Sequence, residues 1–195
     1  MDSAQGHARL RLLLRDLLDD GADSLSARMT FLLADMRARW DDLDRRIAAF
    51  DAEFAIMARN DDRARRLTGI PGIGALNATA LVAAVGSAAT FGKGRDLAAW
   101  LGLAPRQATT GGKPRLLGIT KRGSRYLRKM LIQGARSAMP SLMRSDTAAG
   151  AWLRALLRRA HPNVAVVALA AKMARTVWAL LRHGGTYAPA PSAAG

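Results

Sequence analysis

Apolar residues recur at alternating steps of four and three along the first third of the chain. The pattern comprises Met29, Leu33, Met36, Trp40, Leu43, Ile47, Phe50, Phe54 and Met57. These steps place the side chains on one stripe of an α-helix, while aspartate and arginine residues occupy many of the positions between them. We call these nine residues the heptad stripe. It predicts a long helix of coiled-coil type that packs against another helix.

A shorter helix is predicted over residues 9–19, where leucines are frequent. Asp20, Gly21, Ala22 and Asp23 then interrupt the pattern, and Ser24 is the expected start of the long helix. The shorter helix is too short to cover the whole heptad stripe. The rest of the stripe is therefore expected to pair with a second chain or with the C-terminal part of the same chain, and the pattern leaves both open.

The stretch Pro71-Gly72-Ile73-Gly74 separates two runs of helix-forming residues. Proline stops the first helix, and the two glycines allow backbone conformations that other residues avoid. This arrangement resembles a helix-hairpin-helix, in which the amides of Gly72, Ile73 and Gly74 would hold a backbone phosphate at a helix N-terminus. The alternative is an ordinary turn between two helices.

Residues 105–123 are rich in glycine, threonine and proline and are predicted to form an exposed loop. The following residues 124–139 alternate apolar and basic positions, which predicts an amphipathic helix. Its apolar positions are Tyr126, Leu127, Met130, Leu131 and Ala135, and its basic positions are Arg125, Arg128, Lys129 and Arg136. We expect the apolar face to pack and the basic face to contact phosphate. Two further helices are predicted over residues 148–159 and 164–182.

The charge of the chain changes at the same point as its pattern. The whole chain of 195 residues has a net charge of +15, but residues 67–195 alone hold 18 lysines and arginines against two acids, which gives +16. A field of this sign favours a polyanion, because each neutralised phosphate releases condensed counterions. Nucleic acid is therefore the expected partner, and the alternatives are a solvated basic face or a membrane surface.

The remaining composition narrows the function classes. The chain has no cysteine, so it has no disulfide and no thiolate metal site. Its N-terminus does not resemble a signal peptide, and no apolar run is long enough to span a bilayer. We therefore expect a cytoplasmic protein that has no membrane partner. The two acids of the basic part, Asp96 and Asp146, are too few for a two-metal nuclease centre, and no metal site is predicted in this chain.

Three segments in order carry a resemblance to a known family. They read LTGIPGIG, then AAWLGLAPRQATTGGKPRLLGITKRGSRYLRKMLIQGAR, then NVAVVALAAKMARTVWALL. Over about residues 64–187 the chain resembles the C-terminal half of transposases of the insertion sequence 110/116/902 family. The heptad helix is similar to the coiled-coil arm that precedes this half in the family.

The resemblance implies an RNA-guided recombinase. In this family an N-terminal RuvC-like domain supplies four metal-binding acids, and the C-terminal domain supplies a serine that forms a covalent link to DNA. We expect this chain to lack the RuvC-like half. Mg²⁺ would be bound by that half, and this chain would bind no cofactor. Where the family has serine near ATTGGK, this sequence has Thr109 and Thr110. Thr110 is the candidate nucleophile and Thr109 the next, although both are also explained as loop residues that bind a phosphate or cap a turn.

These observations predict an all-α chain with three parts: a coiled-coil helical arm over 1–62, a transposase C-terminal DNA-binding domain over 63–187, and a disordered tail over 188–195. The expected partners are DNA, a structured guide RNA, and a second copy bound through the coiled coil. The alternatives are a non-catalytic nucleic-acid-binding remnant of a transposase and a basic membrane-surface binder. Besides the three amides of the turn, the residues expected to bind nucleic acid are Arg106, Lys113, Arg115, Lys121, Arg122, Arg125 and Arg128.

Overall fold

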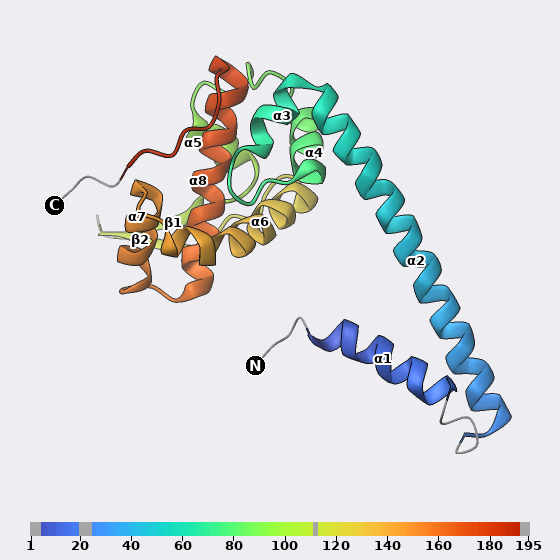
Figure 1. Cartoon of the computed structure of the whole chain (residues 1–195). Coiled ribbons are helices and arrows are strands. Elements are labelled where there is room, and N and C mark those ends of the chain that lie inside the picture. Colours follow the sequence, from blue (N-terminus) through green and yellow to red (C-terminus); the bar gives the residue numbers. More distant parts are fainter. Residues whose placement is uncertain (1–4, 20–24, 111–112, 192–195) are drawn as a thin grey trace. The chain divides into compact units, whose positions relative to one another are not determined.

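The computed structural model describes residues 5–19, 25–110 and 113–191 (Figure 1). Over these residues the all-α prediction is confirmed, with one difference: a two-stranded antiparallel hairpin lies where an exposed loop was predicted. The strands are β1 (Pro105–Thr110) and β2 (Lys113–Ile119). The helices are α1 (Gln5–Asp19), α2 (Ala27–Asn60), α3 (Asp62–Thr68), α4 (Ala75–Val85), α5 (Gly94–Trp100), α6 (Arg125–Arg144), α7 (Ala148–Leu157) and α8 (Pro162–His183).

The chain divides into two compact units between Ala52 and Glu53, which is earlier than the boundary predicted near residue 62. The difference arises because α2 is one continuous helix that begins in the first unit and ends in the second. The long predicted helix is thus present, although it begins at Ala27 rather than Ser24. The predicted break at residues 20–23 lies outside the described residues.

In the first unit, polar contacts of Arg11 join α1 to α2. The Arg11 guanidinium forms ion pairs with Asp41, at 3.5 Å, and with Asp44, and it lies 5.3 Å from the centre of the Trp40 ring. The heptad stripe stays largely open in this unit, because Leu43 and Ile47 are each 56% exposed. The contacts of α1 therefore do not cover the stripe, as the length of the short helix predicts.

Asp61 lies between α2 and α3 and caps the N-terminus of α3. Its carboxylate accepts hydrogen bonds from the backbone amides of Arg63, at 2.7 Å, and Ala64, at 3.2 Å. The side-chain hydrogen bond from Arg63 is the largest cause that lowers the pKa of Asp61, and the two amides lower it further. Because this pKa is lowered on folding, the cap stabilises the fold above the ordinary aspartate pKa and weakens as the pH falls below it.

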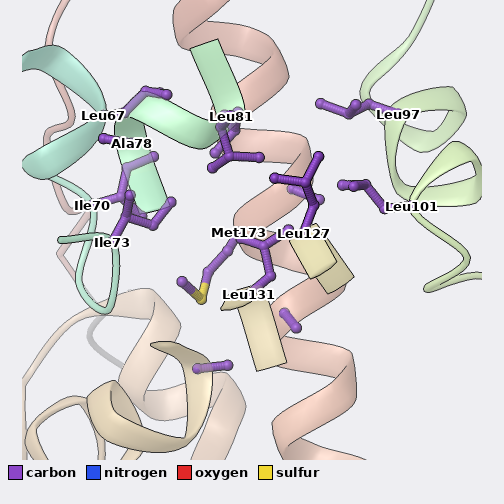
Figure 2. Close-up of a cluster of buried hydrophobic side chains, with 14 of the residues drawn as sticks. Leu67, Ile70, Ile73, Ala78, Leu81, Leu97, Leu101, Leu127, Leu131 and Met173 are labelled. Carbon is purple, nitrogen blue, oxygen red and sulfur yellow. The ribbon is translucent and has the colours of Figure 1, made fainter. Parts of the chain in front are cut away.

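The core of the second unit forms around α8, which packs against α3, α5, α6 and α7. Figure 2 shows Leu67, Ile70 and Leu81 from the α3–α4 region and Leu97 and Leu101 from the α5 region, with side chains of α6 and α8 between the two groups. By length and composition α8 is apolar enough to cross a membrane, but half of its most apolar window is buried in the protein. Its apolar character is therefore used in the core.

The C-terminal segment returns to α7. The amide of Ala148 donates a hydrogen bond to the carbonyl oxygen of Ala190 at 2.9 Å, and Thr147 and Pro191 form an isolated β-bridge. This ordered pairing differs from the tail predicted over 188–195, because the backbone of Ala190 satisfies an amide at the N-terminus of α7. Residues 192–195 lie outside the described part of the chain.

Candidate nucleic-acid interface

The hairpin β1–β2 carries the two candidate nucleophiles at its far end. Thr110 pairs with Lys113 and Thr109 with Pro114, and Arg115 pairs with Ala108 farther back along the ribbon. For residues 108–110 and 113–116 the structure describes the backbone alone. Arg106 lies nearer the base of the hairpin, is exposed, and occupies an irregularity in the strand pairing between Pro105 and Gln107.

The base of the hairpin is fixed to the end of α5 by backbone contacts. The amide of Thr120 donates to the carbonyl oxygen of Ala104 at 2.9 Å, and that of Lys121 donates to Gly102 at 3.1 Å. Lys121 has a φ of 58°, a left-handed conformation that side-chain-bearing residues rarely adopt. Gly123 packs so closely on Trp100 that an added Cβ would lie 1.8 Å from the Trp100 oxygen. These contacts fix the turn that joins β2 to α6.

Arg128 supports this turn from the buried side of α6. Its side chain is 9% exposed, and its Nη1 donates hydrogen bonds to the carbonyl oxygens of Leu101, at 3.1 Å, and Arg122, at 2.8 Å. A buried guanidinium needs such partners, because an unpaired buried charge is costly. Arg128, predicted to bind nucleic acid, thus lies apart from the exposed cations and positions the turn that carries them.

The exposed cations gather around the N-terminus of α6. Ser124 caps this helix by accepting a hydrogen bond from the amide of Leu127 at 3.3 Å. We call Lys121, Arg122 and Arg125, all exposed, the basic turn. Farther along α6 the exposed side holds two more cations, Lys129 and Arg136. The sequence from Leu97 to Ser145 contains no acid, so no carboxylate of this stretch neutralises these cations.

The Pro71–Gly74 turn is built differently from the predicted phosphate site. The amide of Ile73 already donates to the carbonyl oxygen of Ile70 at 3.0 Å, and the Ile73 side chain is buried. Gly72 has a φ of 87° and faces α6, where an added Cβ would lie 2.2 Å from the carbonyl oxygen of Gly134. Gly74 alone of the three is exposed and has open space around it, and it forms the N-cap of α4.

The two acids of the basic part lie apart from these cations in sequence and role. Asp96 caps α5 by accepting a hydrogen bond from the amide of Lys93 at 2.9 Å, and Asp146 is exposed in the turn before α7. Across the described ranges, no three histidine, cysteine, aspartate or glutamate residues come together as metal ligands would. These described residues therefore do not form a divalent metal site of their own.

Sequence reasoning misassigned two residues of α6. Tyr126, predicted to pack, is 51% exposed, and Arg128, predicted to contact phosphate, is buried. Helical geometry accounts for both, because the residue two positions after Tyr126 faces nearly the opposite side of the helix. The spacing contained this signal: Arg128 shares its face with Leu131 and Ala135, whereas Tyr126 shares its face with Lys129 and Gln133.

Comparisons with known proteins show which sequences this chain is similar to. Residues 64–149 match the model of the transposase IS116/IS110/IS902 family. Over 95% of its length the chain is 41% identical to a protein of Pseudomonas aeruginosa described as a family 20 transposase, covering 55% of that protein. Over 94% of its length it is 37% identical to the transposase for insertion sequence element IS1111A of Coxiella burnetii, covering 50% of it.

A third relative is the transposase for insertion sequence element IS1328 of Yersinia enterocolitica. The chain is 36% identical to it over 80% of the chain's own length, and the match covers 47% of that transposase. The chain thus spans about half the length of the curated relatives it matches. The family match includes the Pro71–Gly74 turn, the hairpin, the basic turn and α6. The chain thus matches the IS116/IS110/IS902 family of insertion-sequence transposases over residues 64–149, and it is similar to part of each of these longer relatives.

Proposed function

We propose that this chain is a DNA-binding part of an insertion-sequence transposase that takes part in strand cleavage and exchange. The observation that carries the proposal is the basic turn, in which three exposed cations lie at the capped N-terminus of α6. The backbone contacts with Gly102 and the Arg128 hydrogen bonds hold this turn in place before any ligand arrives. A preorganised cationic turn binds phosphate at a lower entropic cost than a flexible one.

A salt titration of DNA binding tests the proposal. We expect the chain to bind duplex DNA of unrelated sequences with similar affinity, and the affinity to fall steeply as salt rises, with a log–log slope of about 0.9 for each phosphate neutralised. Fluorescence anisotropy of labelled duplexes at several salt concentrations measures this slope. A slope near zero would contradict the proposal, because phosphate neutralisation by cations releases counterions.

The matched variant replaces the basic turn by glutamine at Lys121, Arg122 and Arg125, and we expect it to lower the slope by about 2 to 3. The control replaces Arg39, Arg45 and Arg65 in the same way. Each control arginine forms an ion pair with an aspartate on its own helix, so it is already partly neutralised. Both triple variants lose the same charge, and a control that lowers the slope equally would point to net charge rather than to the basic turn.

The finer steps of the proposed function follow the family resemblance. Gly74 would bind a DNA phosphate through the free N-terminus of α4, and Thr110 would attack a phosphodiester from the end of the hairpin. Arg106, Lys113 and Arg115 would contact DNA or a structured guide RNA along the same hairpin. The exposed N-terminus of α4, which no side chain caps, supports the first step.

We also propose that the chain forms a homo-oligomer through the heptad stripe. The exposure of Leu43 and Ile47 in the first unit supports this, because apolar stripes on long helices are stabilised by pairing. Replacing Trp40, Leu43 and Ile47 by glutamine is expected to convert a dimer into a monomer while the helical signal of the second unit persists. Light scattering at about 50 µM and circular dichroism measure the two effects. A monomeric parent protein would remove the premise.

A non-catalytic role in nucleic-acid binding is the second candidate. The observation that favours it is the scarcity of acids after residue 66, where Asp96 is already used as a helix cap. The salt titration gives the same result for both candidates, and the formation of a covalent DNA adduct, discussed below, distinguishes them.

A further inference from the structure

Tyr126 is an exposed aromatic ring among cations. It lies in the first turn of α6, directly after Arg125 of the basic turn, and its side chain is 51% exposed. Lys129, three residues later, and Gln133, seven residues later, are also exposed and lie on the same face of the helix. Within the described residues the Tyr126 ring contacts no other ring and its hydroxyl makes no hydrogen bond. Folding of the described chain therefore leaves about half of this side chain open to a ligand.

The backbone beneath the ring is held firmly. Ser124 caps the helix, Gly123 packs on Trp100, and the buried Arg128 bonds to the carbonyl oxygen of Arg122. Tyrosine has only two rotatable side-chain bonds, so a ring on such a turn loses little entropy when a planar group stacks on it. Cations on both sides would neutralise the phosphates that flank a stacked base.

We propose that Tyr126 is a stacking platform for an unpaired nucleobase. The proposal rests on the proposed function, since it assumes that the basic turn binds the nucleic-acid backbone. The basic turn and Lys129 would hold the phosphates on either side of the base, and the ring would stack on the base itself. A paired base inside a duplex keeps both faces covered by its neighbours, so the site selects bases that are bulged, flipped or single-stranded.

The test compares a DNA duplex with the same duplex carrying one bulged 2-aminopurine, whose fluorescence falls when it stacks. We expect the parent chain to bind the bulged probe about tenfold more tightly than the plain duplex and to quench its fluorescence. Tyr126→Phe keeps the ring and should retain both effects. Tyr126→Leu removes the aromatic face and should lose the tenfold preference and the quenching, while its affinity for the plain duplex stays unchanged.

Two controls separate stacking from charge and from folding. Lys129→Gln should weaken binding to both probes by a similar factor, because it removes a phosphate contact and leaves the ring. The thermal melting temperature of Tyr126→Leu should stay close to that of the parent, because the ring is half exposed and makes no hydrogen bond or ring contact within the described residues. A matched RNA duplex with the same bulge shows whether the base comes from DNA or RNA, and a Tyr126-dependent preference on either probe supports the site.

The outcomes distinguish this inference from the proposed function. If Tyr126→Leu quenches the 2-aminopurine fluorescence and prefers the bulged probe as strongly as the parent does, the stacking platform is overturned. The proposal of DNA binding is not affected by that result. If the parent binds the plain duplexes but prefers neither the DNA bulge nor the RNA bulge, the platform is overturned in the same way. If the parent binds neither probe, the proposed function fails and the platform fails with it.

Discussion

Gly134→Ala is expected to lower the free energy of unfolding by about 3 kcal/mol, although it lies inside a helix. An alanine in the middle of an isolated helix stabilises it by about 1 kcal/mol relative to glycine. Here the added Cβ would lie 2.0 Å from the carbonyl oxygen of Gly72, which belongs to the turn between α3 and α4. The turn must therefore move away from α6, and the buried side chain of Ile73 moves with it.

Chemical denaturation followed by circular dichroism measures this loss. The matched control is Gly118→Ala in β2, where an added Cβ has no atom within 4 Å and where we expect a change of less than about 0.5 kcal/mol. An unchanged or increased stability of Gly134→Ala would show that helix propensity outweighs the contact with Gly72. That result would contradict the close packing of the turn on α6.

Thr110→Val is expected to abolish a covalent link between protein and DNA in the reconstituted enzyme. A hydroxyl that attacks a phosphodiester loses its proton to a base and forms a new P–O bond, while the P–O bond to one DNA sugar breaks and the sugar oxygen leaves as a hydroxyl. Negative charge grows on the phosphoryl oxygens during this exchange, so the step needs a base and a preorganised set of cations. The basic turn supplies cations, but after residue 66 the chain has only Asp96 and Asp146 as acids. We therefore expect no adduct from this chain alone, and an adduct when a metal-binding half and guide RNA are added.

Denaturing gel electrophoresis with labelled DNA detects the adduct. Valine has nearly the shape of threonine but lacks the hydroxyl, so its loss of adduct reports on the oxygen rather than on packing. Thr110→Ser should form the adduct faster, because it removes the methyl group that crowds the approach to phosphorus. A persistent adduct in Thr110→Val would move the nucleophile, with Thr109 as the next residue to test. An adduct formed by this chain alone would overturn the need for a second half.

The hydrophobic pattern was sufficient to predict most of the helices, although it did not predict the short helix α5. The heptad stripe predicted α2, and the alternation of apolar and basic residues predicted α6, because helical periodicity is a local property of the sequence. The hairpin β1–β2 was missed. Its strands are short and rich in glycine, threonine and proline, and their pairing is fixed at the base by the hydrogen bond from Thr120 to Ala104, which no periodicity reveals.

The role of the Pro71–Gly74 turn shows the same division. The sequence alone indicated a tight turn between two helices there, since proline and glycine restrict the backbone locally. It also predicted that the amide of Gly72 binds phosphate, and the structure adds that this glycine packs closely on Gly134 of α6. Only the fold brings these two glycines together, because Gly72 lies in the turn between α3 and α4 and Gly134 lies much later in the chain, inside α6.

The sequence by itself determined the helical class, the charge step and the resemblance to a transposase family. Those properties follow from composition, from spacing within one helix and from motifs read along the chain. Only the tertiary structure decided which cations are available to a ligand. Arg128 and Arg125 are equally basic in sequence, but Arg128 finds two backbone carbonyls inside the fold and Arg125 faces solvent. Burial depends on contacts between distant segments, and no local pattern encodes it.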